Sequence, residues 1–282
     1  MAYIPHNKKI VDEEQVIKDY QSGISTPVLA QKYGYKTPKS INDLLRRNGV
    51  LPRTVLESQH QRKGYNGLKL DVIDSQLKAY YIGLLITDGY IHEDNGKYYI
   101  ELTLEDEDVI SFLSKEFNTS YIQIKRKEKN RKILYRITLH GKELVDDVKR
   151  YGLTQAKSFT VCNNMKLEYY EEKFIPYILR GAIDGDGWIR KDGKEFFLCG
   201  ASIYFIVWAF NAFVSLGFRD LQIKIKPQNK DLNYHDVFEI RSANQKNIEL
   251  LKNIIYDAPY GMNRKYNRLH QNLHEGRSET II

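Results

Sequence analysis

The sequence YYIGLLITDGYI at Tyr80–Ile91 returns, with changes, as YILRGAIDGDGWI at Tyr177–Ile189. Asp88 in the first stretch aligns with Asp186 in the second, at an offset of 98 residues. Weaker matches continue along the chain at offsets of 101 and then 103 residues, a drift that small loop insertions produce. Self-similarity at a nearly fixed spacing is the mark of an internal duplication. We therefore predict two copies of one folded unit.

Each copy is expected to run helix, hairpin, helix, hairpin, helix, because helical and period-two apolar patterns alternate in that order. The turn sequence Asp94-Asn95-Gly96 is typical of a tight hairpin. In the first copy the expected elements are a helix at 77–88, strands at 89–93 and 97–104, a helix at 106–117, strands at 121–127 and 133–140, and a helix at 142–151. In the second copy the same elements fall at 173–186, 188–201, 202–216, 221–242 and 245–256.

The second hairpin of each copy begins with a strand that alternates isoleucine with polar residues. Side chains alternate between the two faces of a strand, so one face is expected to be core and the other cationic. The residues expected on the polar face are Gln123, Lys125 and Lys127 in the first copy, and Lys224 and Lys226 in the second. One such strand alone is typical of a solvated surface. Two copies together predict a broad basic sheet surface that suits a DNA duplex.

Charge is distributed unevenly along the chain. The formal net charge is +7, and residues 1–70 hold twelve Lys and Arg against six Asp and Glu. Most of the excess therefore lies at the N-terminal end, where a polyanion is the natural partner.

Residues 11–50 break into three short helical segments. Acidic residues open the first at Asp12, Pro27 lies in the first turn of the second, and Gly34 ends it. Thr37 as cap and Pro38 as first helical residue start the third.

This segment resembles the helix-turn-helix of resolvase-like and homeodomain-like proteins, in which the third helix enters the major groove. The resemblance implies that the DNA contacts come from Lys36, Lys39, Ser40, Asn42, Arg46 and Arg47. The alternative is a small helical bundle that docks on the rest of the protein.

The two duplicated stretches resemble the paired motifs of single-chain LAGLIDADG homing endonucleases, over about residues 70–270. In that family the two motif helices pack side by side at a pseudo-twofold axis. Gly83 and Gly181 match the glycine that allows this close contact. A mid-helix glycine costs about 1 kcal/mol relative to alanine, so its presence in both copies requires a reason such as helix packing.

The resemblance also implies a catalytic site. Asp88 and Asp186 match the family's paired carboxylates, which hold Mg²⁺ or another divalent cation for phosphodiester hydrolysis. For either aspartate alone, Asp-Gly turn chemistry is the simpler explanation; the equivalent placement of both favours metal binding. Arg241 matches the family's basic residue near the end of the last strand, and a plain phosphate contact is the alternative. Asp184 aligns with Ile86, which has no carboxylate, so we interpret Asp184 as a residue with a structural role.

Other features set limits. Cys162 and Cys199 are the only cysteines, which argues against a disulfide framework or a cysteine zinc site. No signal peptide or membrane span is visible, so a cytoplasmic protein is expected. The basic tail after Asn263 is expected to be a solvated or DNA-facing helix.

We thus expect an α+β protein: two pseudo-twofold related αββαββα repeats that form a DNA-binding saddle, preceded by a small all-α helix-turn-helix domain. The expected divisions are a DNA-binding domain at 1–50, a basic linker at 51–70, a first repeat at 71–160, and a second repeat with the basic tail at 161–282. The expected function is site-specific cleavage of double-stranded DNA, by a monomer that recognises a long site and leaves short 3′ overhangs. A non-cleaving DNA-binding regulator and an RNA-splicing maturase are the alternatives.

Overall fold

The computed structural model describes residues 12–22, 24–54, 68–125, 132–155, 170–227 and 236–270. The chain divides into two compact units, residues 1–63 and 64–282. Lys127 and the tail beyond His270 lie outside the described residues, so the expectations for them are not addressed by the structure.

The described part of the first unit, residues 12–22 and 24–54, contains three helices, α1 (Glu13–Gln21), α2 (Thr26–Tyr33) and α3 (Pro38–Arg47). The Asp12 side chain caps α1 by accepting a hydrogen bond from the backbone N–H of Gln15 at 3.1 Å. Gly34 ends α2 in the left-handed conformation, with φ of 73°. One face of each helix supplies the small core, made of Val16, Tyr20, Leu29, Ala30, Ile41, Leu44 and Leu45.

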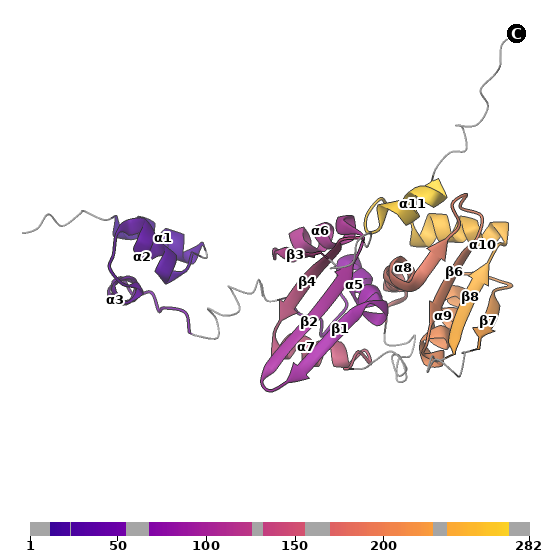
Figure 1. Ribbon diagram of the computed structural model, residues 1–282, viewed down its shortest axis with the longest axis horizontal. Coiled ribbons are helices and arrows are strands. Elements are labelled where there is room, and N and C mark those ends of the chain that lie inside the picture. Colours follow the sequence, from indigo (N-terminus) through magenta and orange to yellow (C-terminus); the bar gives the residue numbers. More distant parts are fainter. Residues whose placement is uncertain are drawn as a thin grey trace, which may run out of the picture. The chain divides into compact units, whose positions relative to one another are not determined.

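The second unit contains two four-stranded antiparallel sheets, each with helices packed on one face (Figure 1). The first repeat runs α5 (Gln76–Thr87), β1 (Gly89–Asp94), β2 (Lys97–Leu104), α6 (Glu107–Glu116), β3 (Tyr121–Ile124), β4 (Leu134–His140) and α7 (Lys142–Lys149). The second runs α8 (Ile175–Asp186), β5 (Gly187–Ile189), β6 (Phe196–Gly200), α9 (Ile203–Ser215), β7 (Gln222–Lys226), β8 (Val237–Ser242) and α10 (Gln245–Leu250).

The duplication is evident in the sheet topology. The strand orders are β1-β2-β4-β3 and β5-β6-β8-β7, so the two sheets have the same connectivity. The expected fold class, an α+β protein with two αββαββα repeats, is confirmed. The second repeat adds a short helix before α8 (Glu172–Phe174), a π-helical turn after α10 (Leu251–Ile255) and a final helix, α11 (Asn263–His270).

Apolar residues from both repeats form one continuous core. Inward-facing residues of the central strands, such as Leu102 and Ile137 in one sheet and Leu198 and Ile240 in the other, are fully buried. Between the sheets lie α5 and α8, which pack directly against each other. Within the described residues, no helix is both long enough and apolar enough to cross a membrane.

The register of the strands corrects part of the sequence alignment. Gly89 pairs with Leu102 and Gly187 with Leu198, so β2 and β6 correspond at an offset of 96 residues rather than 98. The hairpin from Gly187 to its partner Leu198 is two residues shorter than the hairpin from Gly89 to its partner Leu102, which accounts for the change. In the same way Tyr121, which pairs with Ile137, corresponds to Ile223, which pairs with Ile240.

Candidate functional site

The contact between α5 and α8 is a backbone contact at two glycines. A methyl group added at Gly83 would lie 2.1 Å from the carbonyl oxygen of Ile178, and one at Gly181 would lie 2.1 Å from the carbonyl oxygen of Tyr80. Both positions are therefore closed to any side chain. The close approach explains why a helix-weakening residue occurs at the same place in both copies.

This packing brings the two aspartates to the same place. Asp88 follows the last residue of α5, and Asp186 is the last residue of α8. A methyl group at Gly185, next to Asp186, would lie 2.3 Å from Oδ2 of Asp88 and 2.0 Å from Oγ1 of Thr87. The carboxylate of Asp88 therefore lies against the last turn of α8, beside the residue that carries the second carboxylate.

The acidic pair fits a hard divalent cation that is shared with a ligand. Across residues 68–125, 132–155, 170–227 and 236–270, no three His, Cys, Asp or Glu residues cluster in a way that could enclose a metal. Asp88 and Asp186, at the neighbouring ends of α5 and α8, are the two carboxylates that a cation could use. Mg²⁺ prefers this arrangement, with one or two carboxylates and the remaining ligands from water and phosphate oxygens.

Cys199 and Glu239 share the neighbourhood of Asp186. The Cys199 thiol donates a hydrogen bond to the backbone oxygen of Asp186 at 3.1 Å. Burial raises the pKa of this thiol to about 11, helped by the negative charges of Asp186 and Glu239. Cys199 is thus a neutral donor that fixes the end of α8, and it is not a reactive thiolate.

A buried lysine that the sequence analysis missed caps the end of α8. Lys265 on α11 is 1% exposed, and its ammonium donates hydrogen bonds to the backbone oxygens of Ile183, Asp184 and Gly187. These are carbonyl groups at the end of a helix, where a cation is favoured by the helix dipole. Burial lowers the pKa of Lys265 to about 8, against the attraction of Asp184. The expectation of a solvated or DNA-facing tail helix is therefore wrong for the side of α11 that carries Lys265 and Leu269, whereas Asn263, Arg264 and Asn267 are exposed.

Asp184 anchors the segment that leads to α11. Its fully buried carboxylate accepts hydrogen bonds from the Tyr80 hydroxyl at 2.8 Å, the Tyr256 hydroxyl at 2.7 Å and the Met262 backbone N–H at 3.1 Å. Burial raises the pKa of this carboxyl. These contacts tie α5, α8 and the C-terminal segment together, which is a structural role.

Arg180 holds the same segment from the other side of α8. Its guanidinium is fully buried between the rings of Tyr256 and Tyr260, with 4.7 Å and 3.8 Å from its carbon to the ring centroids. It also donates to the backbone oxygens of Tyr260 and Ile255. Arg180 therefore binds this C-terminal segment to α8.

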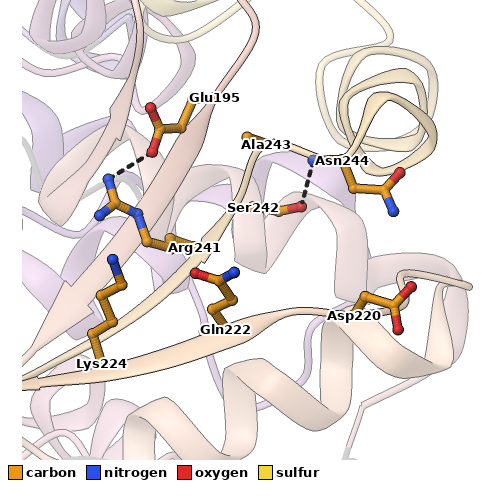
Figure 2. A pocket seen from close by; sticks show the side chains of 8 residues that line it. All are labelled: Glu195, Asp220, Gln222, Lys224, Arg241, Ser242, Ala243 and Asn244. Carbon is orange, nitrogen blue, oxygen red and sulfur yellow. Dashed lines mark hydrogen bonds and ion pairs between the residues drawn. The ribbon is translucent and has the colours of Figure 1, made fainter.

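Arg241 lies on the outer face of the second sheet, at the edge of a small cavity of about 250 Å³ (Figure 2). Its guanidinium donates to Oε1 of Glu195 at 2.6 Å, and its Nε lies 3.5 Å from Oε1 of Glu239. Lys226 binds the other oxygen of Glu239 at 2.6 Å. Arg241 is therefore held in a chain of alternating charges.

The sheet registers place another arginine nearer to the acidic pair. Ile240 is in the row of Gly187 and Leu198, so Arg241 lies one row further from Asp186, beside Phe197. In the first repeat Arg136 pairs with Thr103, the residue after the partner of Gly89. Arg136 therefore falls in the row that leads to Asp88. Its Nε donates to Thr103 Oγ1 at 3.0 Å. Arg136 was not among the site residues expected from the sequence.

The polar faces of the two sheets are not equivalent. Lys224 pairs with Glu239, on the outer face, as expected for it and for Lys226. Gln123, in contrast, pairs with Tyr135, whose ring packs against the core, while Ile122 pairs with Arg136 on the outer face. The expectation that Gln123 shares the polar face is wrong. The offset of 101 residues aligns Ile122 with Ile223, whereas the strand register shows that Tyr121 corresponds to Ile223. Lys125 is exposed and lies just after the end of β3.

In the first unit, α3 buries Ile41, Leu44 and Leu45 and exposes its basic side. Lys36, Lys39, Arg46 and Arg47 are exposed, whereas Ser40 and Asn42 are partly buried. Arg46 pairs with Asp43 at 3.5 Å and Arg47 with Glu13 at 3.1 Å, both at the surface. Such exposed ion pairs contribute little to the stability of the fold, so the arginines stay available to another anion.

Comparison with known proteins identifies the first repeat. Residues 77–151 match the family model of the WhiA LAGLIDADG-like domain. This match confirms the resemblance of the first repeat to LAGLIDADG proteins, and the second repeat has the same sheet topology. No curated protein matches the chain.

Solved structures similar to this chain include the homing endonuclease I-WcaI bound to its DNA recognition sequence, with 18% identity, 82% of this chain and 98% of that chain covered, and a TM-score of 0.49. I-DmoI in complex with DNA and Mn matches with 15% identity, 66% and 98% coverage, and a TM-score of 0.43. The N-terminal LAGLIDADG domain of DUF199/WhiA matches with 14% identity, 73% and 91% coverage, and a TM-score of 0.42.

Proposed function

We propose that this protein is a site-specific endonuclease that cuts both strands of a DNA duplex with the help of Mg²⁺ or another divalent cation. The observation that carries the proposal is the contact of the Asp88 carboxylate with Gly185, next to Asp186. This contact supports a shared site to which each repeat contributes one carboxylate. Two neighbouring carboxylates repel each other, and a cation bound between them offsets this repulsion.

Asp88 and Asp186 are the residues that would hold the cation. A bound divalent cation activates water and neutralises charge on the scissile phosphate. The chain's own residues orient the site: the glycine contact sets the spacing of α5 and α8, and Lys265 and Cys199 fix the end of α8. Because each repeat contributes one carboxylate and the two sheets have the same strand order, the site suits the two strands of a duplex. Short 3′ overhangs are the expected product.

The outer faces of the sheets would contact the DNA. Lys224 and Lys226 are the basic residues of the described strands that match this role, with Arg241 as a phosphate contact. The exposed basic side of α3 would extend the footprint beyond the sheets, through Lys36, Lys39, Arg46 and Arg47. The neutral residues Ser40 and Asn42 would complete this contact.

The test is cleavage of a library of duplexes in the presence of Mg²⁺, with the ends of any products mapped. Asp88→Asn and Asp186→Asn keep the size of the side chain and remove its charge. We expect each to abolish double-strand cleavage while duplex binding persists. Asp74→Asn is the matched control, because Asp74 is an exposed aspartate beside the opposite end of α5, where it pairs with Lys78.

Normal cleavage by both variants would refute the assignment of the acidic pair. Duplex binding without cleavage by the unmodified protein would instead favour the alternative function, a non-cleaving DNA-binding regulator. This alternative is supported by the match of residues 77–151 to the model of the WhiA LAGLIDADG-like domain, whose name does not refer to cleavage. Selective binding to structured RNA would favour the maturase alternative.

A further inference from the structure

The outer face of the first sheet ends in an apolar patch. Ile122 is 57% exposed, although it lies on the polar side of the sheet beside Arg136. Ile124 and Leu134 form the next cross-strand pair on the same face. None of these three side chains packs against the core, whereas Tyr121 and Tyr135 on the opposite face do.

The second sheet has lysines at the corresponding positions. Tyr121 corresponds to Ile223 by register, so Ile122 corresponds to Lys224 and Ile124 to Lys226. The lysines can donate hydrogen bonds to phosphates and to guanine, while the isoleucines can donate none. The two sheets therefore offer different chemistry at the same place in their surfaces.

Only one feature of the major groove rewards an aliphatic side chain. The bases present hydrogen-bonding edges there, except for the C5-methyl group of thymine, which makes apolar contacts with protein side chains. An isoleucine placed against a base edge without that methyl group would leave a polar atom of the base without a partner. Isoleucines on the outer face of a groove-reading sheet thus favour thymine by attraction and disfavour its competitors by desolvation.

We propose that Ile122 and Ile124 determine specificity by contacting thymine methyl groups, so that the half-site bound by the first repeat contains thymine where the half-site bound by the second repeat does not require it. This inference rests on the proposed binding of duplex DNA to the outer faces of the sheets. Arg136, in the same row as Ile122, provides the neighbouring polar contact.

The test compares thymine with deoxyuridine, which lacks only the methyl group. Binding sites are first selected from a randomised duplex library with the full-length protein and Ca²⁺. Lys224→Ala and Lys226→Ala then identify the half-site of the second repeat by footprinting. Each thymine of the other half-site is replaced by deoxyuridine, and the dissociation constant is measured.

We expect one or two of these replacements to weaken binding about fourfold each, the value for one buried methyl group. In the Ile122→Ala and Ile124→Ala variants the ratio of thymine to deoxyuridine affinity should fall to near one at the same positions. Ile223→Ala is the matched control, because Ile223 is a 48% exposed isoleucine on an edge strand but faces the helix side of its sheet. It should leave every ratio unchanged.

Two results would overturn the inference while the proposed function stands: selected sites without thymine in the half-site of the first repeat, or a deoxyuridine effect that persists in Ile122→Ala and Ile124→Ala. Failure of the protein to bind any duplex would remove the proposed function, and the inference with it. Ile122 is exposed, so its replacement by alanine is expected to leave the fold intact.

Discussion

Replacing Gly83 by alanine tests the helix contact on which the site depends. The added methyl group would lie 2.1 Å from the carbonyl oxygen of Ile178, where ordinary contact begins at 3.4 Å. The clash is with backbone, so no side chain can rotate to relieve it. The helices would have to separate by roughly 1 Å, which loses dispersion contacts along the whole interface.

The size of the effect follows from two opposing contributions. Overpacking of this kind costs about 3 kcal/mol, the upper end of the usual range, because both partners are backbone. Alanine recovers about 1 kcal/mol of helix propensity relative to glycine. We therefore expect Gly83→Ala to lower the free energy of unfolding by about 2 kcal/mol, and to move Asp88 away from Asp186.

Urea unfolding followed by tryptophan fluorescence measures this change in the correct part of the chain. The two tryptophans, Trp188 and Trp208, both belong to the unit formed by residues 64–282. Gly200→Ala is the control, because its methyl group would meet the ring of Phe205 at 2.8 Å, and a ring can shift. We expect that control to cost less than about 1 kcal/mol.

The double variant Gly83→Ala, Gly181→Ala sharpens the test. The same separation of the helices relieves both clashes, so the combined cost should be clearly less than the sum of the two single costs. If Gly83→Ala instead raised the free energy of unfolding by about 1 kcal/mol, the change would be explained by the helix propensity of alanine alone. The close backbone contact, and the convergence of the aspartates with it, would then be refuted.

Two further predictions concern charged groups. Lys265→Met should lower the stability of the second unit by about 3 kcal/mol in the same urea assay, because it leaves three carbonyl groups without their donor, whereas Arg268→Met, which removes one hydrogen bond to Ile189, should cost about 1 kcal/mol. Equal costs would contradict the capping role. In the first unit, hydrogen bonds from Lys32 and Tyr33 hold the pKa of Asp19 at about 2, below its ordinary 3.8. The folded pKa is the lower one, so this contribution is present above about pH 4 and is lost as the pH falls towards 2. In the full-length protein, the rate at which pepsin cuts within residues 12–54 should rise as the pH falls over that range. Asp19→Asn should remove this pH dependence. If the variant shows the same pH dependence as the unmodified protein, Asp19 does not link α1 to α2.

The sequence alone was sufficient for the duplication, and it also supplied the prediction of the acidic pair. Gly83 with Gly181, and Asp88 with Asp186, stand at the same offset inside similar segments. Local patterns also located most helices and strands, because helix caps, turn residues and apolar periodicity act over a few residues. The three helices of the first unit begin and end at the residues that such signals favour.

The tertiary structure decided the rest, since these features depend on pairing between distant segments. The alternation in Ile122, Gln123 and Ile124 has a period of two, and only the register with β4 determines which residues face outward; one step of register exchanges the faces. Lys265 is similar: in sequence it belongs to a basic tail, but the free carbonyl groups at the end of α8 provide a buried site for its charge. Local sequence signals therefore predict helices, strands and turns, whereas the contacts between distant residues are determined only when the chain has folded.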